Sequence, residues 1–401
     1  MHPIIPAVLL AFLLTAHARA EGISVDPIVP IEADRVTHQT LPDIVYRESD
    51  IHRRLPSDRR LALVKMLTDI EQDIQFGGIS AAVLIPGEGV WQWSSGIADH
   101  RSGEALETGH LMHLGSIGKI ATAGLIWQLI EQQRLQLDQS IAPFFPDWPD
   151  VSDVTIAQLL NHTSGIYSFN WSPLVRASTV HWQAHELLTI ARDQPLLFEP
   201  GTQWSYSNTN YLMLGLIAEQ LHQSDFRRLL DQQLLQPLRL ANSVVLEAES
   251  AADIVLPSYL DGELQPGHYA LPHGAGTLAM TPHDLVNWFY QLLSGQWLQR
   301  ASVQSMLEQL LPMSHQDGLY YGLGLMRLDT PVGPWIMHSG GIAGYRSMVA
   351  YSPAYNCFVA VISNHGEDAA PLSLKLMETM AAVERQRQTT AVETNARHHH
   401  Q

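Results

Sequence analysis

One serine in the chain is followed by a lysine at the spacing that can activate its hydroxyl. The chain contains three lysines, and only Lys119 completes a Ser-x-x-Lys sequence, with Ser116. Residues three apart share one face of a helix, so the amine of Lys119 can reach the hydroxyl of Ser116. A serine hydroxyl is a weak nucleophile at neutral pH, and a partly desolvated lysine can act as its base. The pair therefore predicts nucleophilic catalysis, with a chance pair at the surface as the alternative.

A second candidate is a loop rich in hydroxyl and amide side chains, from Trp204 to Tyr211, which follows a Pro-Gly turn signal. Polar site groups often gather in loops of this kind between apolar helices. The phenol of Tyr206 can carry a proton, and the amide of Asn208 can hydrogen-bond a carbonyl or a lysine. The other interpretation is a capping loop for a helix that begins near Tyr211. We also expect Trp204 to lie near a substrate.

The third candidate lies at the end of an apolar strand and comprises Met337, His338, Ser339, Gly340 and Gly341. Small residues after a histidine allow a ligand to approach the strand backbone closely. Amide N–H groups at such an edge can stabilise an oxyanion. The same sequence also fits a turn that carries a solvated histidine.

The hydrophobic pattern places strands towards both ends of the chain and helices in the middle. It predicts an amphipathic helix over 59–74, then strand, turn and strand over 81–97. A long helix is expected after Ser116, followed by helical segments and Pro- or Gly-rich loops. Further strands are expected at 320–328, 335–338, 345–352 and 358–363, before a last helix over 369–387. This order predicts an α+β fold, in which one antiparallel sheet is flanked by the terminal helices and carries a large inserted helical region.

The two ends of the chain are expected to lie outside the main domain. Residues 1–20 combine an apolar run with a small-x-small sequence, which is typical of a secretory signal peptide cut after Ala20. The run is too short to span a bilayer, so we expect no stable membrane anchor after cleavage and a periplasmic or secreted protein. The expected parts are a leader over 21–56, one domain over 57–388, and a flexible tail over 389–401 that contains His398–His400. Within the domain, the sheet part is expected at about 57–115 and 318–388, and the mostly helical part at about 116–317.

The composition disfavours several classes of protein. The chain is 46% hydrophobic and 16% charged, unlike a disordered chain. Its formal net charge of −17 argues against nucleic acid as a partner, because phosphate binding needs clustered Lys and Arg. The single cysteine, Cys357, excludes an internal disulfide.

We expect no metal and no cofactor, and we interpret His110 and His113 as ordinary residues, with His113 lining the cleft. An α/β-hydrolase is disfavoured because Leu114 stands where Gly-x-Ser-x-Gly needs its first glycine.

The three candidate groups, in this order, resemble the penicillin-recognising serine hydrolases. The similarity is greatest to the branch of class C β-lactamases, D-alanyl-D-alanine carboxypeptidases and related esterases, and it runs from about Leu61 to Glu378. It includes segments with no direct chemistry, namely Leu159–Ile166, Phe198–Gly201, Gly274–Gly276 with Thr281–Leu285, and Tyr321–Leu325. The resemblance implies a β-lactamase/transpeptidase-like fold and a small-molecule or peptide acyl substrate.

The resemblance also implies a role for each candidate residue. Ser116 would be the nucleophile that becomes acylated, and Lys119 would take or relay its proton. Tyr206 would share the acid–base work, and Asn208 would orient Lys119 and the substrate amide. The backbone N–H groups of Ser116 and Gly341 would form the oxyanion hole.

Three positions bear on which substrate is recognised. His338 stands where many relatives carry lysine, and a neutral or charged imidazole there could steer an anionic substrate. Relatives that act on D-peptides place an arginine directly after Tyr-Gly-Leu-Gly-Leu, where it holds the terminal carboxylate. This chain has Met326 at that position. The next residue is Arg327, and adjacent strand residues point to opposite faces. Gly341 replaces a frequent Ser or Thr. These differences favour an ester or amide of a neutral acyl compound over a D-peptide or a β-lactam. The other function left open is a non-catalytic, exported binding or regulatory protein on the same fold.

Overall fold

The computed structural model describes residues 27–71, 77–176, 181–246, 254–265, 273–313, 318–366 and 369–398. The predicted signal peptide lies outside the described residues. In the part of the chain that is described, no helix is long and apolar enough to cross a membrane.

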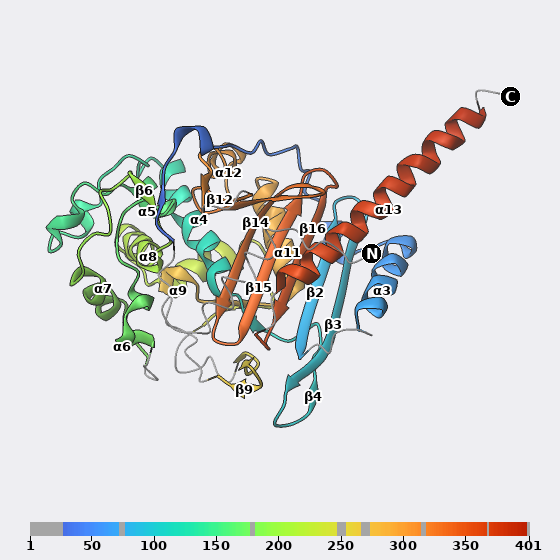
Figure 1. The fold of residues 1–401 in the computed structure, drawn as a ribbon, viewed down its shortest axis with the longest axis horizontal. Helices are drawn as coiled ribbons and strands as arrows, with labels where there is room; N and C mark the ends of the chain where they lie inside the picture. Colours follow the sequence, from blue (N-terminus) through green and yellow to red (C-terminus); the bar gives the residue numbers. More distant parts are fainter. Residues whose placement is uncertain are drawn as a thin grey trace.

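A nine-stranded antiparallel sheet forms the centre of the molecule (Figure 1). Its order is β11-β12-β13-β14-β15-β16-β2-β3-β4, so the N-terminal strands lie beside the C-terminal ones. Strands β2 and β16 are buried at every residue, which agrees with their continuous apolar sequences and with cover on both faces. The strand bounds are β2 (Gly78–Ile85), β3 (Gly89–Asp99), β4 (Glu104–Ala105), β11 (Leu311–Pro312), β12 (Leu319–Tyr321), β13 (Met326–Thr330), β14 (Gly333–Ile342), β15 (Tyr345–Ser352) and β16 (Cys357–Ser363).

Helices cover both faces of this sheet. Helices α3 (Ser57–Glu71) and α13 (Ala369–His398) pack on one face, where Ala81 and Val83 of β2 join their apolar cluster. Helix α11 (Pro282–Leu293) packs on the other face, together with Ala82 and Leu84. Successive strand residues point to opposite faces, so one strand contributes to both cores. The predicted α+β architecture, with terminal helices flanking the sheet, is therefore confirmed.

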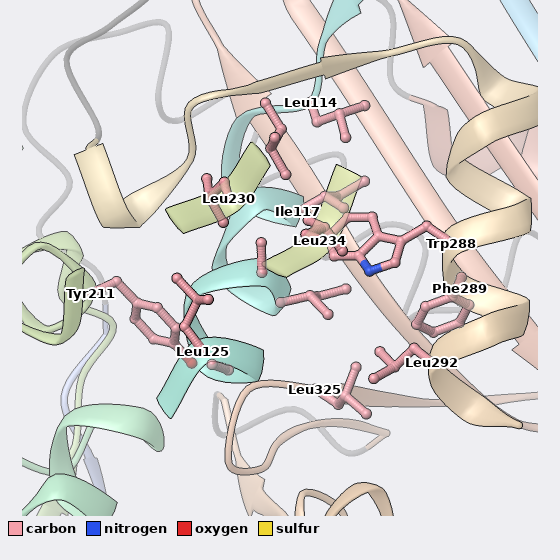
Figure 2. Packing of buried hydrophobic residues seen from close by; sticks show 14 of the residues in the cluster. Leu114, Ile117, Leu125, Tyr211, Leu230, Leu234, Trp288, Phe289, Leu292 and Leu325 are labelled. Atoms are coloured by element: carbon pink, nitrogen blue, oxygen red, sulfur yellow. The ribbon is translucent and has the colours of Figure 1, made fainter. Parts of the chain in front are cut away.

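The inserted region is mostly helical and surrounds helix α4 (Gly118–Glu131), which is buried along most of its length. Figure 2 shows Ile117 and Leu125 at this helix between Tyr211 on one side and Trp288 of α11 on the other. The other helices of the region are α5 (Ile156–Leu160), α6 (Pro173–Arg176), α7 (Ala184–Arg192), α8 (Asn208–His222), α9 (Phe226–Leu230) and α12 (Arg300–Ser305). Its short strands are β5 (Met112–His113), β6 (Gln203–Trp204), β7 (Ser243–Val245), β8 (Tyr259–Leu260), β9 (Glu263–Leu264) and β10 (Leu278–Met280).

The described part of the leader packs along the domain. Strand β1 (Val29–Pro30) pairs with β6, directly before the loop that carries Tyr206, and helix α2 (Glu48–His52) follows. Leu41 and Ile44 of the leader enter the main apolar core. The leader is thus anchored at several points by side-chain burial and strand pairing.

Two predicted strands differ in extent from those observed. The segment 320–328, predicted as one strand, is a hairpin of β12 and β13, because Gly324 has φ +107° and the N–H of Gly322 donates to the carbonyl of Leu325. The strand predicted over 335–338 continues to Ile342 as β14, because β15 pairs with it along that whole length.

The last helix is longer than predicted. Helix α13 continues past residue 387 to His398, into the segment predicted as a flexible tail, and Figure 1 shows its end extending away from the sheet. No Gly or Pro follows Pro371 in the chain, so nothing in the sequence terminates the helix.

Candidate active site

The predicted nucleophile lies on a tight turn that leads directly into a buried helix. Ser116 is the middle residue of a 3-10 turn, Gly115–Ile117, and α4 begins at the next residue. Gly115 has φ +53°, a left-handed conformation that glycine adopts without steric cost. Ser116 is half-buried, whereas Lys119 is completely buried, and Lys119 Nζ lies 3.0 Å from Ser116 Oγ. The spacing of the two residues therefore has the predicted geometric result.

The amine of Lys119 is surrounded by acceptors from three parts of the chain. Nζ donates to Ser116 Oγ, to Asn208 Oδ1 at 2.7 Å and to the carbonyl of Ala275 at 2.8 Å. It also lies 5.0 Å from the ring centroid of Tyr206. These three acceptors match the three N–H donors of an ammonium group, and a neutral amine in this place can direct its lone pair at Ser116 Oγ. The arrangement therefore suits proton transfer between lysine and serine.

Asn208 is held so that its oxygen faces Lys119. It is the first residue of α8, which begins before the predicted start near Tyr211. Its Nδ2 donates to Asn170 Oδ1 at 2.8 Å, and its backbone N–H donates to Ser168 Oγ, also at 2.8 Å. The orientation of the amide follows from these partners. Asn170 and Ser168 were not predicted as site residues, and only the geometry of the folded chain identifies them.

His338 is a buried strand residue, not a solvated turn residue. It is 1% exposed in the middle of β14. Its Nδ1 donates to the carbonyl of Ser339 at 2.7 Å, and its Nε2 lies 3.1 Å from the hydroxyl of Tyr321 and accepts a hydrogen bond from it. Burial, with a smaller contribution from the charge of Lys119, lowers the pKa of His338 to about 3. The imidazole is therefore neutral, and this environment does not favour the charged alternative that the sequence allowed.

The end of β14 lies against the Ser116 turn with almost no space between the backbones. Strand β13 pairs with β14 only as far as Met337, so the edge beyond it is free of β13. A Cβ added to Gly340 would lie 1.9 Å from the carbonyl oxygen of Leu114, and one added to Gly115 would lie 2.8 Å from the backbone nitrogen of Gly341. Ser339 is half-buried and Gly341 is exposed. The edge therefore combines close approach to the serine turn with access from solvent.

Three side chains mentioned in the sequence analysis lie away from the reacting groups. His113 is completely buried below the Ser116 turn, where its Nδ1 accepts from the N–H of Gly115 at 2.9 Å, so it does not line the cleft. His110 lies 3.4 Å from Glu104 on a different part of the surface. Trp204 is 2% exposed behind the loop, contrary to the expectation that it lies near a substrate.

Arg327 is engaged at the far side of its strand. Its guanidinium bonds Asp329 at 2.6 Å and Thr37 of the leader at 3.1 Å, whereas Met326 is buried in the apolar cluster on one face of the sheet. Neither residue supplies a cation beside Ser116. A different guanidinium lies beside the edge of β14: Nη1 of Arg346 would be 3.5 Å from a Cβ on Gly341, and it donates to the carbonyls of Ala343 and Tyr345.

Together these groups have the chemistry that acyl transfer requires. The half-buried hydroxyl of Ser116, the buried amine of Lys119, the phenol of Tyr206 and the amide of Asn208 meet at the free edge of β14. Among the described residues, no group of three or more His, Cys, Asp or Glu side chains is placed to hold a metal ion. The arrangement offers candidates for a nucleophile, a base and a second proton carrier.

Comparison with protein families gives a match over most of the chain. The family model described as Beta-lactamase matches residues 63–382. Penicillin-binding protein 4* of Bacillus subtilis (strain 168) is 25% identical over 344 residues, which cover 78% of this chain and 74% of that protein. Penicillin-binding protein 4 of Amycolatopsis lactamdurans is 28% identical over 314 residues, which cover 72% of this chain and 81% of that protein.

Solved structures share the same fold. The D-amino acid amidase from Ochrobactrum anthropi SV3, in complex with D-phenylalanine, superposes with a TM-score of 0.73 at 22% identity, covering 82% of this chain and 100% of that one. A penicillin-binding protein from Bacillus halodurans gives a TM-score of 0.67 at 23% identity, covering 80% of this chain and 98% of that one. These likenesses support the architecture derived above from the sheet order and the helical layers.

Proposed function

The chain belongs to the β-lactamase family of serine hydrolases, and we propose that it cleaves amides or esters without a free carboxylate through an acyl-enzyme on Ser116. The observation that carries this proposal is the 3.0 Å separation of Lys119 Nζ and Ser116 Oγ, with the lysine completely buried. A buried amine is more easily kept neutral than an exposed one, and a neutral amine is a base. The same contact is what a serine nucleophile requires.

The proposed reaction has two stages. Neutral Lys119 accepts the proton of Ser116 Oγ as that oxygen attacks the substrate carbonyl, and the N–H groups of Ser116 and Gly341 stabilise the oxyanion. The leaving group departs with a proton from Tyr206, which Lys119 restores, so the acyl-enzyme forms without net loss of protons. In the second stage Lys119 takes the proton of Tyr206, and the resulting phenolate takes a proton from water as the water attacks the acyl carbonyl. Lys119 then returns its proton to Ser116 Oγ as the acyl group leaves.

The proposed substrate class rests on two positions, Met326 and Gly341, at which this chain lacks the carboxylate-binding side chains expected from the family resemblance. Recognition of a terminal carboxylate is strengthened by a guanidinium or a pair of hydroxyl donors. Here Met326 is apolar, Arg327 is bonded elsewhere and Gly341 has no side chain. The guanidinium of Arg346, which lies beside Gly341, donates to the backbone carbonyls of Ala343 and Tyr345. His338 is held neutral by burial. One relative with the same fold is named as an amidase of D-amino acids, which agrees with an amide substrate that ends without a carboxylate.

A matched pair of dipeptides tests the substrate class. The two compounds are N-acetyl-D-alanyl-D-alaninamide and N-acetyl-D-alanyl-D-alanine, which differ only in the terminal carboxylate. We expect kcat/KM to be at least about tenfold higher for the amide. This factor corresponds to one charge-assisted hydrogen bond that the enzyme does not make to the carboxylate. Benzylpenicillin is included as a β-lactam, and Ser116→Ala serves as the control in every assay. The opposite order of the two dipeptides would overturn the substrate class, and equal turnover by Ser116→Ala would overturn the mechanism. No turnover and no adduct with any compound would support a binding protein instead.

We further propose that the protein is exported, on the basis of the apolar segment and the small-x-small sequence before residue 21. The protein isolated from the periplasm or the medium of an expressing cell is expected to begin at Glu21. A full-length chain retained in the cytoplasm would contradict this.

A further inference from the structure

His162 is a fully buried histidine that has no part in the proposed reaction, yet it lies beside the proposed acid–base residue. It belongs to the segment Leu159–Ile166, for which the family resemblance implied no direct chemistry. It is 0% exposed, and its backbone has φ +64°, a left-handed conformation that residues other than glycine seldom adopt. A conformation of this kind at a buried polar residue is maintained by its surroundings, and such residues concentrate near functional sites.

The hydrogen bonds of His162 enclose Tyr206 along the chain. The carbonyl of His162 accepts from the N–H of Ser205 at 3.0 Å, and its Nδ1 accepts from the N–H of Ser207 at 3.2 Å. The residues immediately before and after Tyr206 are therefore both attached to one residue. The amide of Asn210 lies 3.3 Å from the same Nδ1.

The ring of His162 also supports the ring of Tyr206. Their centroids are 4.3 Å apart with an interplanar angle of 35°, and Tyr321, Tyr211 and Trp204 surround the imidazole at 4.6, 5.2 and 6.2 Å. Nε2 is buried without a hydrogen-bond partner in the described part of the chain. Contacts of this geometry between aromatic rings are favourable and restrict rotation of the phenol.

The protonation state of His162 fits this supporting position. Nδ1 accepts from backbone N–H, so the proton of the neutral ring is on Nε2. Burial holds the pKa of His162 well below its usual range. The acceptor at Nδ1 is therefore available throughout the neutral pH range.

We propose that His162 is a positioning residue, which fixes the phenol of Tyr206 relative to Ser116 and Lys119 through two backbone hydrogen bonds and one ring contact. The inference rests on the proposed function, because it requires Tyr206 to act as an acid and a base. His162 itself touches no reacting atom. Its loss is expected to reduce the steps that use Tyr206 and to leave the nucleophile in place.

Two complementary variants separate this role from general stability. His162→Asn suits the left-handed backbone and removes the ring, whereas His162→Phe keeps a ring and removes the Nδ1 acceptor. Thr163→Val is the matched control, because it removes the 2.7 Å hydrogen bond from Thr163 to Asn161 in the same buried segment. The probes are p-nitrophenyl acetate and phenyl acetate, which share an acyl group and differ in how much their leaving groups need a proton.

The expected result is a defect that depends on the leaving group. For His162→Asn, kcat/KM should fall about tenfold or more further with phenyl acetate than with p-nitrophenyl acetate, as it should for Tyr206→Phe. The double variant His162→Asn/Tyr206→Phe should be no slower than Tyr206→Phe alone, because both changes act on one group. Thr163→Val should leave the ratio of the two esters unchanged.

Three results would count against the inference. An equal loss with both esters, or a double variant in which the two losses multiply, would show that His162 acts independently of Tyr206. Unchanged kinetics in a folded His162→Asn would do the same. If wild-type protein turned over neither ester and acquired no adduct on Ser116, the proposed function would fail first, and the positioning role would fail with it.

Discussion

Replacing Lys119 by methionine removes the amine beside Ser116 while keeping most of the side-chain volume. A general base contributes about 10²- to 10⁴-fold to a rate. Lys119 is completely buried and lies 3.0 Å from Ser116 Oγ, a place where methionine supplies no base. We therefore expect acylation to slow by about 10³-fold, which corresponds to about 4 kcal/mol at 1.4 kcal/mol for each factor of ten.

Stability should change much less than the rate in this variant. The acceptors on Asn208 and Ala275 lose their donor, which costs roughly 1–3 kcal/mol for a buried group, but an ammonium no longer has to be desolvated. The assay is the second-order rate of fluorophosphonate adduct formation, followed by intact mass, with thermal unfolding measured in parallel. Lys65→Met, at an exposed position of α3, is the matched control. A Lys119→Met rate within tenfold of wild type would refute the reasoning.

Two further predictions concern the strand beside the serine. The pKa of His338 is about 3 in the folded chain, and its ordinary value is 6.5. Between these two pH values the unfolded chain binds a proton that the folded chain excludes. The free energy of unfolding therefore falls as pH drops from 6.5 towards 3, by roughly 3 kcal/mol at pH 4. Urea unfolding of His338→Gln should show a correspondingly weaker acid dependence, and identical pH slopes would contradict this. Gly340→Ala should cut the acylation rate at least about 100-fold, because its Cβ would meet the Leu114 carbonyl at 1.9 Å. Gly341→Ala should reduce the rate far less, because its Cβ meets the flexible side chain of Arg346 at 3.5 Å. Equal effects of the two substitutions in the adduct assay would refute this.

Local spacing explains which parts of the site could be predicted. Ser116 and Lys119 are three residues apart, and the geometry of a helix turn brings them together without reference to the rest of the fold. Tyr206 and Asn208 were predicted from side-chain chemistry, but their position beside Lys119 depends on packing between α4 and α8. Asn170 and His162 act on those residues through contacts that no periodicity encodes. They could not be separated from ordinary loop residues before the fold was known.

The errors in the fold have equally local causes. The hairpin of β12 and β13 is predicted as one strand because residues 320–326 are apolar apart from two glycines. The hydrogen bond that turns the chain between Gly322 and Leu325 has no hydrophobic signal. Strand β14 was ended too early because the small residues after His338 carry no alternation, whereas pairing with β15 continues through them. That omission affects the site directly, since the missed residues form the edge that lies against Ser116.

The most direct test of the account is the intact mass of the mature protein after treatment with a fluorophosphonate, compared with Ser116→Ala under the same conditions. The account predicts one adduct on the wild-type protein, located on the peptide that contains Ser116, and none on the variant. Undiminished labelling of Ser116→Ala, or an adduct on another residue of the wild-type protein, would contradict the assignment of Ser116 as the nucleophile.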